Sequence, residues 1–286
     1  MSIETGTAVT AAEFQPGHSG KVLQQAAAEG RKALVGFYHV GFPEVHASLD
    51  AISVIAGGGG EGPGVDIVEI GMPYSDPVMD GPTIQRAATT ALANGVRTRD
   101  ALVAAETVAQ QGKSPLVMTY WNLIEQYGVE AFARDFANAG GHGLITPDLT
   151  PDEAQEWIAA SEAHGLDRIF LVAPSSTDER ISLTVRACRG WVYATSVMGV
   201  TGTRTSTSSL APALVGRVRS LVPDALVGVG LGVSDGEQAA EVAGFADAVI
   251  VGSALVKTGL TEKSRPEQLA DLAKLTAELA EGVRRG

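Results

Sequence analysis

The chain has 286 residues, of which 45% are hydrophobic and 19% charged, a balance typical of a folded globular protein. Its 21 basic and 33 acidic side chains give a net charge of −12, which argues against general binding of DNA or RNA. The single cysteine, Cys188, excludes an intramolecular disulfide, and no apolar run reaches the length of a membrane span, about 20 residues. The first residues lack the pattern of a signal peptide, so we expect a cytoplasmic protein that binds neither nucleic acid nor membrane.

No linker divides the middle of the chain, which favours a single domain. We expect a mobile tail over residues 1–20 and one catalytic domain over residues 21–286. The run Gly57–Gly60, extended by Gly62 and Gly64, is predicted to be a flexible connector without helix or strand, because consecutive glycines lose much conformational entropy in either.

Short β-branched apolar runs recur along the chain, and a helix-like stretch follows each of them. Most of the runs lack polar and apolar alternation, as expected for parallel strands buried on both faces. The predicted strands are Leu34–Tyr38, Val65–Ile70, Pro115–Trp121, Gly143–Thr146, Arg168–Val172, Trp191–Thr195, Ala225–Val229 and Ala246–Val251.

Helix starts are predicted from capping boxes. In this motif the hydroxyl of the cap residue accepts from the backbone N–H of the third helical residue, and the carboxylate of that residue accepts from the backbone N–H of the cap. Pro151 and Pro266 fall just inside two of these helices, where a missing N–H costs nothing. The four predicted boxes are Thr150 with Glu153, Ser176 with Glu179, Ser234 with Glu237, and Ser264 with Glu267. The last helix carries an apolar stripe of Leu269, Leu272, Leu279 and Val283.

Eight strands alternating with helices predict an α/β fold, a single (β/α)8 TIM barrel with an extra N-terminal helix. A doubly wound open sheet is the alternative, because a count of strands does not establish closure. Its dinucleotide fingerprint is incomplete, since Val233 stands where the third glycine belongs and Asp247 precedes its strand.

The second predicted strand contains Glu69 and leads into a loop with Asp76 and Asp80. In such a barrel the carboxyl ends of the strands form the active site, and burial raises a carboxyl pKa toward the value that a proton shuttle needs. Two interpretations are open: Glu69 is a catalytic acid or a buried partner of a base, and the aspartates are functional groups or caps of turns and helices. The capping interpretation is favoured for Asp76.

Glycine clusters follow the last three predicted strands, at Gly199–Gly202, Gly228–Gly232 and Gly252–Ala254. Backbone N–H groups beside glycines cradle phosphate, and the loops after the seventh and eighth strands are the usual phosphate site of this barrel class. Glycines at strand ends also form tight turns, which is the interpretation favoured for Gly228, whereas Gly232, Gly252 and Ser253 are expected to bind a phosphate group.

Other catalytic patterns are missing from the sequence. The five histidines form no cluster with metal-ligand spacing, so no metal site is expected. The lysines Lys32, Lys113 and Lys257 lie outside the predicted strands, which argues against a Schiff-base site.

The segment from Asp66 to Gln85, which holds both acids, closely resembles the signature of the tryptophan synthase α subunit family. The resemblance runs from about Gly30 to Lys257. It includes Met118–Asn122, Thr146–Asp148, Phe170–Pro174, Gly199–Gly202 and Gly252–Ala254.

This resemblance implies a lyase that splits indole-3-glycerol phosphate into indole and glyceraldehyde 3-phosphate during L-tryptophan biosynthesis. It implies a tryptophan synthase β subunit as partner in an α2β2 heterotetramer, with pyridoxal phosphate expected only in that partner and no cofactor in this chain. Glu69 matches the general acid–base residue and Asp80 the carboxylate that binds indole. The resemblance also implies an indole pocket of Phe37, Tyr120, Tyr193 and Leu231, phosphate binders at Gly202, Gly232, Gly252 and Ser253, and a lid residue at Thr201.

The chain departs from the family pattern in the first strand. His39 stands where the family commonly has threonine, and Gly36 where proline is frequent. His39 either reaches the mouth of the barrel or packs there. Three other functions stay open from the sequence: a stand-alone indole-releasing lyase, a phosphosugar isomerase, and a catalytically silent partner barrel.

Overall fold

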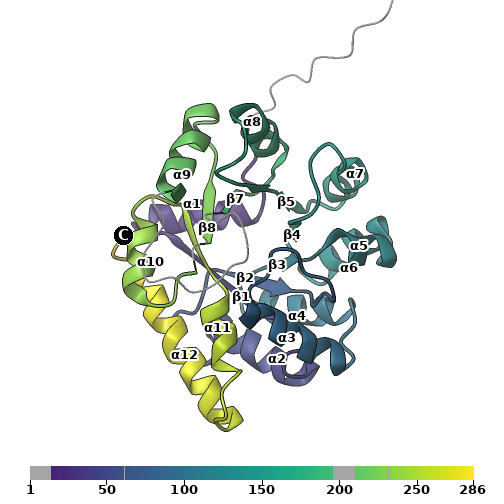
Figure 1. Cartoon of the computed structure of the whole chain (residues 1–286), viewed down its shortest axis with the longest axis vertical. Helices are drawn as coiled ribbons and strands as arrows, with labels where there is room; N and C mark the ends of the chain where they lie inside the picture. Colours follow the sequence, from purple (N-terminus) through teal and green to yellow (C-terminus); the bar gives the residue numbers. More distant parts are fainter. Residues whose placement is uncertain (1–13, 61, 196–209, 231) are drawn as a thin grey trace, which may run out of the picture.

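The computed structural model describes residues 14–60, 62–195, 210–230 and 232–286. Strands and helices alternate around a central sheet, with one helix ahead of the first strand (Figure 1). The strands are β1 (Ala33–His39), β2 (Ile67–Gly71), β3 (Ser114–Met118), β4 (Gly143–Ile145), β5 (Asp167–Ile169), β6 (Leu171–Val172), β7 (Val192–Thr195), β8 (Val227–Gly230) and β9 (Ala248–Val251).

Helices surround the strands on the outside (Figure 1). They are α1 (Ser19–Ala28), α2 (Val45–Ser53), the π-helix η1 (Val54–Gly58), α3 (Pro82–Ala93), α4 (Asp100–Ala109), α5 (Trp121–Tyr127), α6 (Val129–Asn138), α7 (Gln155–Ala163), α8 (Asp178–Ala187), α9 (Leu210–Leu221), α10 (Gly236–Ala243), α11 (Ser253–Thr258) and α12 (Arg265–Gly282). Among the described residues no helix is both long and apolar enough to span a membrane.

The strands form one parallel sheet in the order β5-β4-β3-β2-β1-β9-β8-β7-β6. β5 and β6 are two halves of one strand, separated only by Phe170, so the two ends of this order meet in a single chain segment. The first half pairs with β4 through Gly143 and Asp167, and the second pairs with β7 through Leu171 and Tyr193. The sheet therefore closes into a barrel of eight strands, which confirms the TIM barrel and rejects the open sheet.

Inward and outward side chains alternate along each strand of the barrel. Register places Phe37 of β1 beside Glu69 of β2, and Glu69 beside Leu116 of β3. One buried cluster fills the barrel interior with Val35, Ile67, Leu116, Ile145, Ile169, Trp191, Ala248 and Ile250. Glu69 lies two residues beyond Ile67 and therefore shares its inward direction, one layer closer to the carboxyl ends.

Helix α1 covers the amino-terminal end of the barrel, where its Leu23 and Ala26 join the interior cluster. It begins at Ser19, so the boundary predicted at residue 20 falls inside this helix. Ser19 is buried, and its backbone N–H donates to Asp167 at 2.6 Å. The chain is thus attached to the barrel before residue 20, and residues 1–13 lie outside the described part.

Three of the four predicted capping boxes were wrong. The box at Ser264 and Glu267 is present at the start of α12, with Pro266 in its first turn. Thr177 caps α8 and Asp235 caps α10, each one residue after the predicted serine. The box predicted at Thr150 and Glu153 does not cap a helix, because α7 starts only at Gln155. The Thr150 hydroxyl donates instead to the Glu153 carboxylate, at 3.1 Å, in the turn before the helix, and Pro151 lies in that turn.

The π-helix η1 follows directly from α2 and enters the glycine run, which was predicted to have no helix. The chain is kinked at Gly57, whose φ of +109° is not helical. A methyl group on Gly59 would lie 3.1 Å from Ala273 Cβ of α12, and one on Gly62 equally close to Ala277 Cβ. Gly59 and Gly62 therefore lie where the backbone approaches α12 closely, a position that favours glycine for a reason other than flexibility.

Candidate active site

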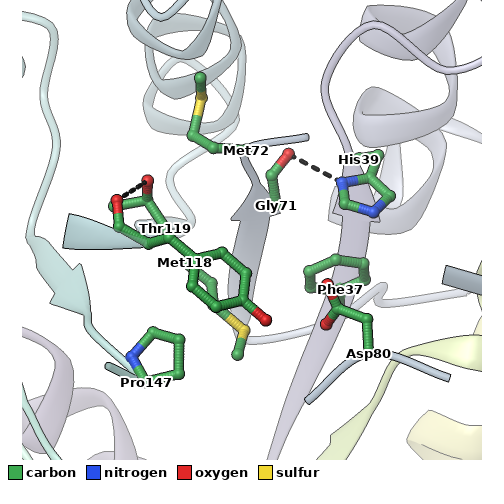
Figure 2. A pocket seen from close by; sticks show the side chains of 9 residues that line it. Phe37, His39, Gly71, Met72, Asp80, Met118, Thr119 and Pro147 are labelled. Carbon is green, nitrogen blue, oxygen red and sulfur yellow. Dashed lines mark hydrogen bonds between the residues drawn. The ribbon is translucent and has the colours of Figure 1, made fainter. Parts of the chain in front are cut away.

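A pocket opens at the carboxyl ends of the first four strands, the end at which barrels of this class carry their active sites. Figure 2 shows Phe37, His39 and Asp80 on one side of it and Thr119 and Pro147 on the other. Its lining residues are Phe37, His39, Gly71, Met72, Asp80, Met118, Thr119, Tyr120 and Pro147. These residues come from the ends of β1, β2 and β3 and from the segments that follow β2, β3 and β4.

Glu69 lies in the middle of β2, and its residue is only 1% exposed. Its Oε2 is buried without a hydrogen-bond partner among the described residues. Burial raises the pKa of Glu69 to about 8, and the nearby Asp80 carboxylate adds to the rise. An uncharged carboxylic acid is therefore stable here at neutral pH, and no partner base of the kind considered from the sequence is present among the described residues.

Asp80 ends the loop between β2 and α3, one residue before the helix N-cap Gly81. Its backbone carbonyl accepts a hydrogen bond from Gln85 Nε2 at 2.7 Å, which ties the loop to the first turn of α3. Burial raises the pKa of Asp80 to about 6. Asp76 is exposed and accepts from Ser75 Oγ at 2.5 Å, so the capping role favoured for it stays a prediction.

Two of the predicted aromatic residues lie close to these acids. Phe37 packs edge-on against His39, with ring centroids 4.9 Å apart, and a methyl group on Gly71 would lie 2.3 Å from the Phe37 ring. Burial raises the pKa of Tyr193 well above its usual value, and the charges of Glu69 and Asp80 add to the rise. The Tyr193 hydroxyl thus stays protonated in the neighbourhood of both carboxyl groups.

His39 both lines the pocket and packs within it. It is 2% exposed, and its Nδ1 lies 3.2 Å from the carbonyl oxygen of Gly71 (Figure 2). Burial lowers the pKa of His39 to about 4, so the ring is neutral at physiological pH. Its Nε2 is buried without a hydrogen-bond partner within the described part of the chain.

The predicted phosphate residues lie at the ends of β8 and β9, which are neighbours in the sheet. Gly252 is the N-cap residue of α11 and Ser253 is its first residue, so N–H groups of the helix start face this end of the barrel. Gly232 has a φ of +70°, a left-handed conformation that favours glycine. A methyl group on Gly252 would lie 3.5 Å from Phe37 Cβ, which brings the phosphate residues next to the aromatic pocket.

Not every predicted site residue falls in the described part of the chain. The lid residue Thr201, the phosphate residue Gly202 and the pocket residue Leu231 lie outside it. Sequence reasoning in turn missed Met72, Met118, Thr119 and Pro147, all of which line the pocket. Met72 and Pro147 closely follow predicted strands, and Met118 and Thr119 lie within one, but none of the four has a side chain that suggests chemistry by itself.

The described residues contain no group of three or more His, Cys, Asp and Glu side chains arranged to hold a metal ion. The raised pKa values of Glu69 and Asp80 make proton transfer to and from a bound molecule possible at this pocket, which has aromatic and apolar walls.

Comparisons with known proteins cover nearly the whole chain. The family model described as tryptophan synthase alpha chain matches residues 23–284. The tryptophan synthase alpha chain of Salinispora arenicola is 60% identical over 267 residues, which cover 93% of this chain and 98% of that relative. A structure of Mycobacterium tuberculosis tryptophan synthase matches with a TM-score of 0.86 at 56% identity, covering 96% of this chain and 100% of that one. A structure of the tryptophan synthase α2β2 complex from Pyrococcus furiosus matches with a TM-score of 0.78 at 31% identity, covering 87% of this chain and 98% of that one.

Proposed function

The chain belongs to the tryptophan synthase alpha chain family, whose reaction is the cleavage of indole-3-glycerol phosphate, and we propose that Glu69 and Asp80 perform that cleavage. The reaction is that of a carbon–carbon lyase, with indole and glyceraldehyde 3-phosphate as products. The observation that carries the proposal is the pair of carboxyl groups, buried Glu69 and partly buried Asp80, whose pKa values are separated, about 8 for Glu69 and about 6 for Asp80. Such a separation assigns an acid and a carboxylate to the same site.

Glu69 acts first as an acid and then as a base. It is protonated at neutral pH and donates its proton to C3 of the indole ring, which leaves a 3H-indolium cation with a weakened bond to the glycerol chain. The Glu69 carboxylate then removes the proton from the adjacent glycerol hydroxyl. The C–C bond breaks, its electrons return to the ring, and the hydroxyl carbon becomes the aldehyde. Glu69 ends the cycle protonated, as it began.

Asp80 acts as the carboxylate of the pair. It accepts the indole N–H and stabilises the positive charge that develops on the ring when C3 is protonated. Its charge also raises the pKa of Glu69, so the same residue that stabilises the cation helps to keep the acid protonated. A carboxylate attracts a nearby cation more strongly in a site of low dielectric constant than in water, so the partial burial of Asp80 favours this role.

The substrate's two ends need different surroundings. Phe37, Tyr120 and Tyr193 supply an aromatic wall for indole, together with Leu231 from the sequence prediction. Gly232, Gly252 and Ser253 supply backbone N–H groups for the phosphate. The further phosphate residue Gly202 and the lid residue Thr201 are predicted from the family resemblance alone, because both lie outside the described residues. Backbone donors bind the anion without adding a cation to this acidic protein.

The partner of this chain is the tryptophan synthase β subunit, as in the α2β2 complex of the Pyrococcus furiosus relative. We assign pyridoxal phosphate to that partner. None of the residues that line the pocket in the described part of this chain is a lysine, the side chain that ordinarily holds the cofactor. The cytoplasmic location stays a prediction.

The pH dependence of kcat/KM for indole-3-glycerol phosphate tests the assignment of the two acids. We expect a bell-shaped profile with an acid limb near the pKa of Asp80, about 6, and an alkaline limb near that of Glu69, about 8. Asp80→Asn is expected to lower kcat/KM by about 10²-fold or more and to remove the acid limb. Glu106→Gln, at an exposed position on α4, is the control and keeps the wild-type profile. A wild-type profile that is flat from pH 5 to 9 would contradict the assignment.

A further inference from the structure

Tyr120 links the floor of the pocket to the loop that carries Asp80. The residue lies between β3 and α5, where it is the helix N-cap, and its side chain is buried. Its hydroxyl oxygen accepts a hydrogen bond from the backbone N–H of Val78, at 2.9 Å, and a second from that of Met79, at 3.2 Å. Its ring also stacks on Tyr74, with centroids 4.6 Å apart. One side chain therefore contacts the loop near both of its ends.

The middle of this loop, around Val78, is too exposed for its position to be fixed by burial alone. Val78 is 77% exposed, and the two residues before Val78 and the two after it are only partly buried or exposed. The start of the loop is attached to β3 through the Met72 N–H, which donates to the Met118 carbonyl at 2.9 Å. Its end is attached to α3 by the bond from Gln85 to the Asp80 carbonyl. Between these attachments, Tyr120 fixes the backbone immediately before Asp80.

We propose that the Tyr120 hydroxyl is a positioning group that anchors the backbone of Val78 and Met79 and thereby holds the Asp80 carboxylate over the indole pocket. This inference rests on the proposed role of Asp80 and extends the predicted role of Tyr120 beyond that of an apolar wall. The phenol oxygen is well suited because it accepts two N–H groups at once and keeps its own proton for donation. A carboxylate displaced by about 1 Å loses on the order of 10²-fold in rate, so the anchor has a large effect on turnover.

The test is Tyr120→Phe, which removes the hydroxyl and keeps the aromatic ring, measured in the complex with the β subunit. The kcat for cleavage of indole-3-glycerol phosphate is expected to fall by about 10- to 100-fold, while KM changes less. The acid limb of the kcat/KM profile is expected to move to lower pH by about half a unit or more, because the released loop exposes Asp80 to water. A residue that only lines the pocket would change KM and leave the acid limb in place.

Tyr127→Phe is the matched control. Tyr127 is the last residue of the same helix, α5, and its hydroxyl donates to Asp135 at 2.8 Å, away from the pocket. The control is expected to keep kcat within about twofold and the acid limb unchanged. Equal kinetics and equal acid limbs for Tyr120→Phe and wild type would overturn the anchor and leave the role of Asp80 intact.

Limited proteolysis of the full-length chain gives a second readout that does not need activity. Elastase cuts after small apolar residues such as the exposed Val78, and the anchored loop resists cleavage. Tyr120→Phe is expected to be cut here several-fold faster than wild type and Tyr127→Phe. Equal cutting rates would contradict the anchor. Faster cutting in Tyr120→Phe without any indole release by the wild type would support the anchor while rejecting the proposed reaction.

Discussion

Burial of Glu69 connects the chemistry of this site to the stability of the fold. The desolvation that raises its pKa to about 8 favours the protonated form in the folded chain. A raised acid pKa stabilises the folded state most below the unfolded value of 4.5, and this stability is lost as the pH rises from 4.5 toward 8. The proposed acid–base group therefore destabilises the protein at the pH where it would work.

Glu69→Gln is expected to increase the free energy of unfolding relative to wild type at pH 8, and to do so far less at pH 5. The expected gain at pH 8 is on the order of 2–4 kcal/mol, because the glutamate loses its proton on unfolding at this pH and so favours the unfolded chain, whereas the amide does not titrate. Urea denaturation at the two pH values measures it. Glu106→Gln, exposed on α4, should show no such pH dependence. A Glu69→Gln chain that is equally stable relative to wild type at both pH values would show that the carboxyl pKa is not raised by folding.

The sequence pattern placed Glu69 in a buried strand and Asp80 in the loop that follows it, but left two interpretations open for each; their proposed roles came from the family resemblance. Residues such as Met118 and Thr119 were not predicted to line the pocket, because an apolar or hydroxyl side chain gives no chemical signal until the register of the strand shows that it faces the pocket. His39 left two interpretations open for the same reason. Its neutrality depends on burial, and its bond to the Gly71 carbonyl depends on the pairing of β1 with β2, which a sequence alone does not contain.

At the scale of elements, the glycine run was predicted to lack helix and strand because consecutive glycines lose much conformational entropy in either. In the structure, η1 extends into the run and is kinked at Gly57. Gly64 has a φ of +68°, and a methyl group on it would lie 2.5 Å from the Gly57 nitrogen. Gly60 has a similar φ of +75° but open space around its Cα. Alanine substitutions at Gly60 and Gly64 therefore measure two costs separately: backbone strain alone at Gly60, and backbone strain together with a steric collision at Gly64.

Gly60→Ala is expected to lower the free energy of unfolding by about 1 kcal/mol, the cost of a left-handed alanine. Gly64→Ala carries the same strain and a backbone collision, so a loss of about 3 kcal/mol or more is expected. Urea denaturation midpoints at constant m-value measure both. Equal losses would mean that this segment moves freely enough to relieve the collision.

The one-residue error in two of the predicted helix caps has a local explanation. Ser176 is followed by Thr177 and Ser234 by Asp235, so two adjacent side chains are each competent to cap. Thr177 accepts from the Arg180 N–H at 3.2 Å and Asp235 from the Gln238 N–H at 2.9 Å. The choice between neighbours depends on the direction in which the chain enters the helix, which is set by packing rather than by the cap itself.

For the whole molecule, the strand count predicted the barrel correctly, while its closure depended on a detail that the count does not show. A single segment, Asp167–Val172, pairs with β4 through its first half and with β7 through its second. Asp167 also holds α1 against the barrel. Its buried carboxylate accepts from the His18 N–H at 3.0 Å and from the Ser19 hydroxyl at 2.6 Å, and Arg189 lies 3.6 Å away.

Asp167→Asn is expected to lower the free energy of unfolding by about 2–4 kcal/mol, because the amide offers N–H groups where three donors need an acceptor. Hydrogen exchange should become faster throughout α1 and less so in β1 and β2. Asp178→Asn removes an ion pair with Arg217 at an exposed position and should cost less than about 1 kcal/mol. Unchanged exchange in α1 would show that this carboxylate does not hold the helix.

The most direct test of the central claim is indole release from indole-3-glycerol phosphate by wild type and Glu69→Gln, each with and without the β subunit. We expect slow release by the wild type alone, strong stimulation by the partner, and a loss of at least about 10²-fold in the variant in both conditions. Tight binding of a non-cleavable substrate analogue by Glu69→Gln would show that the site is intact. A folded, analogue-binding Glu69→Gln chain that releases indole at the wild-type rate would contradict the account.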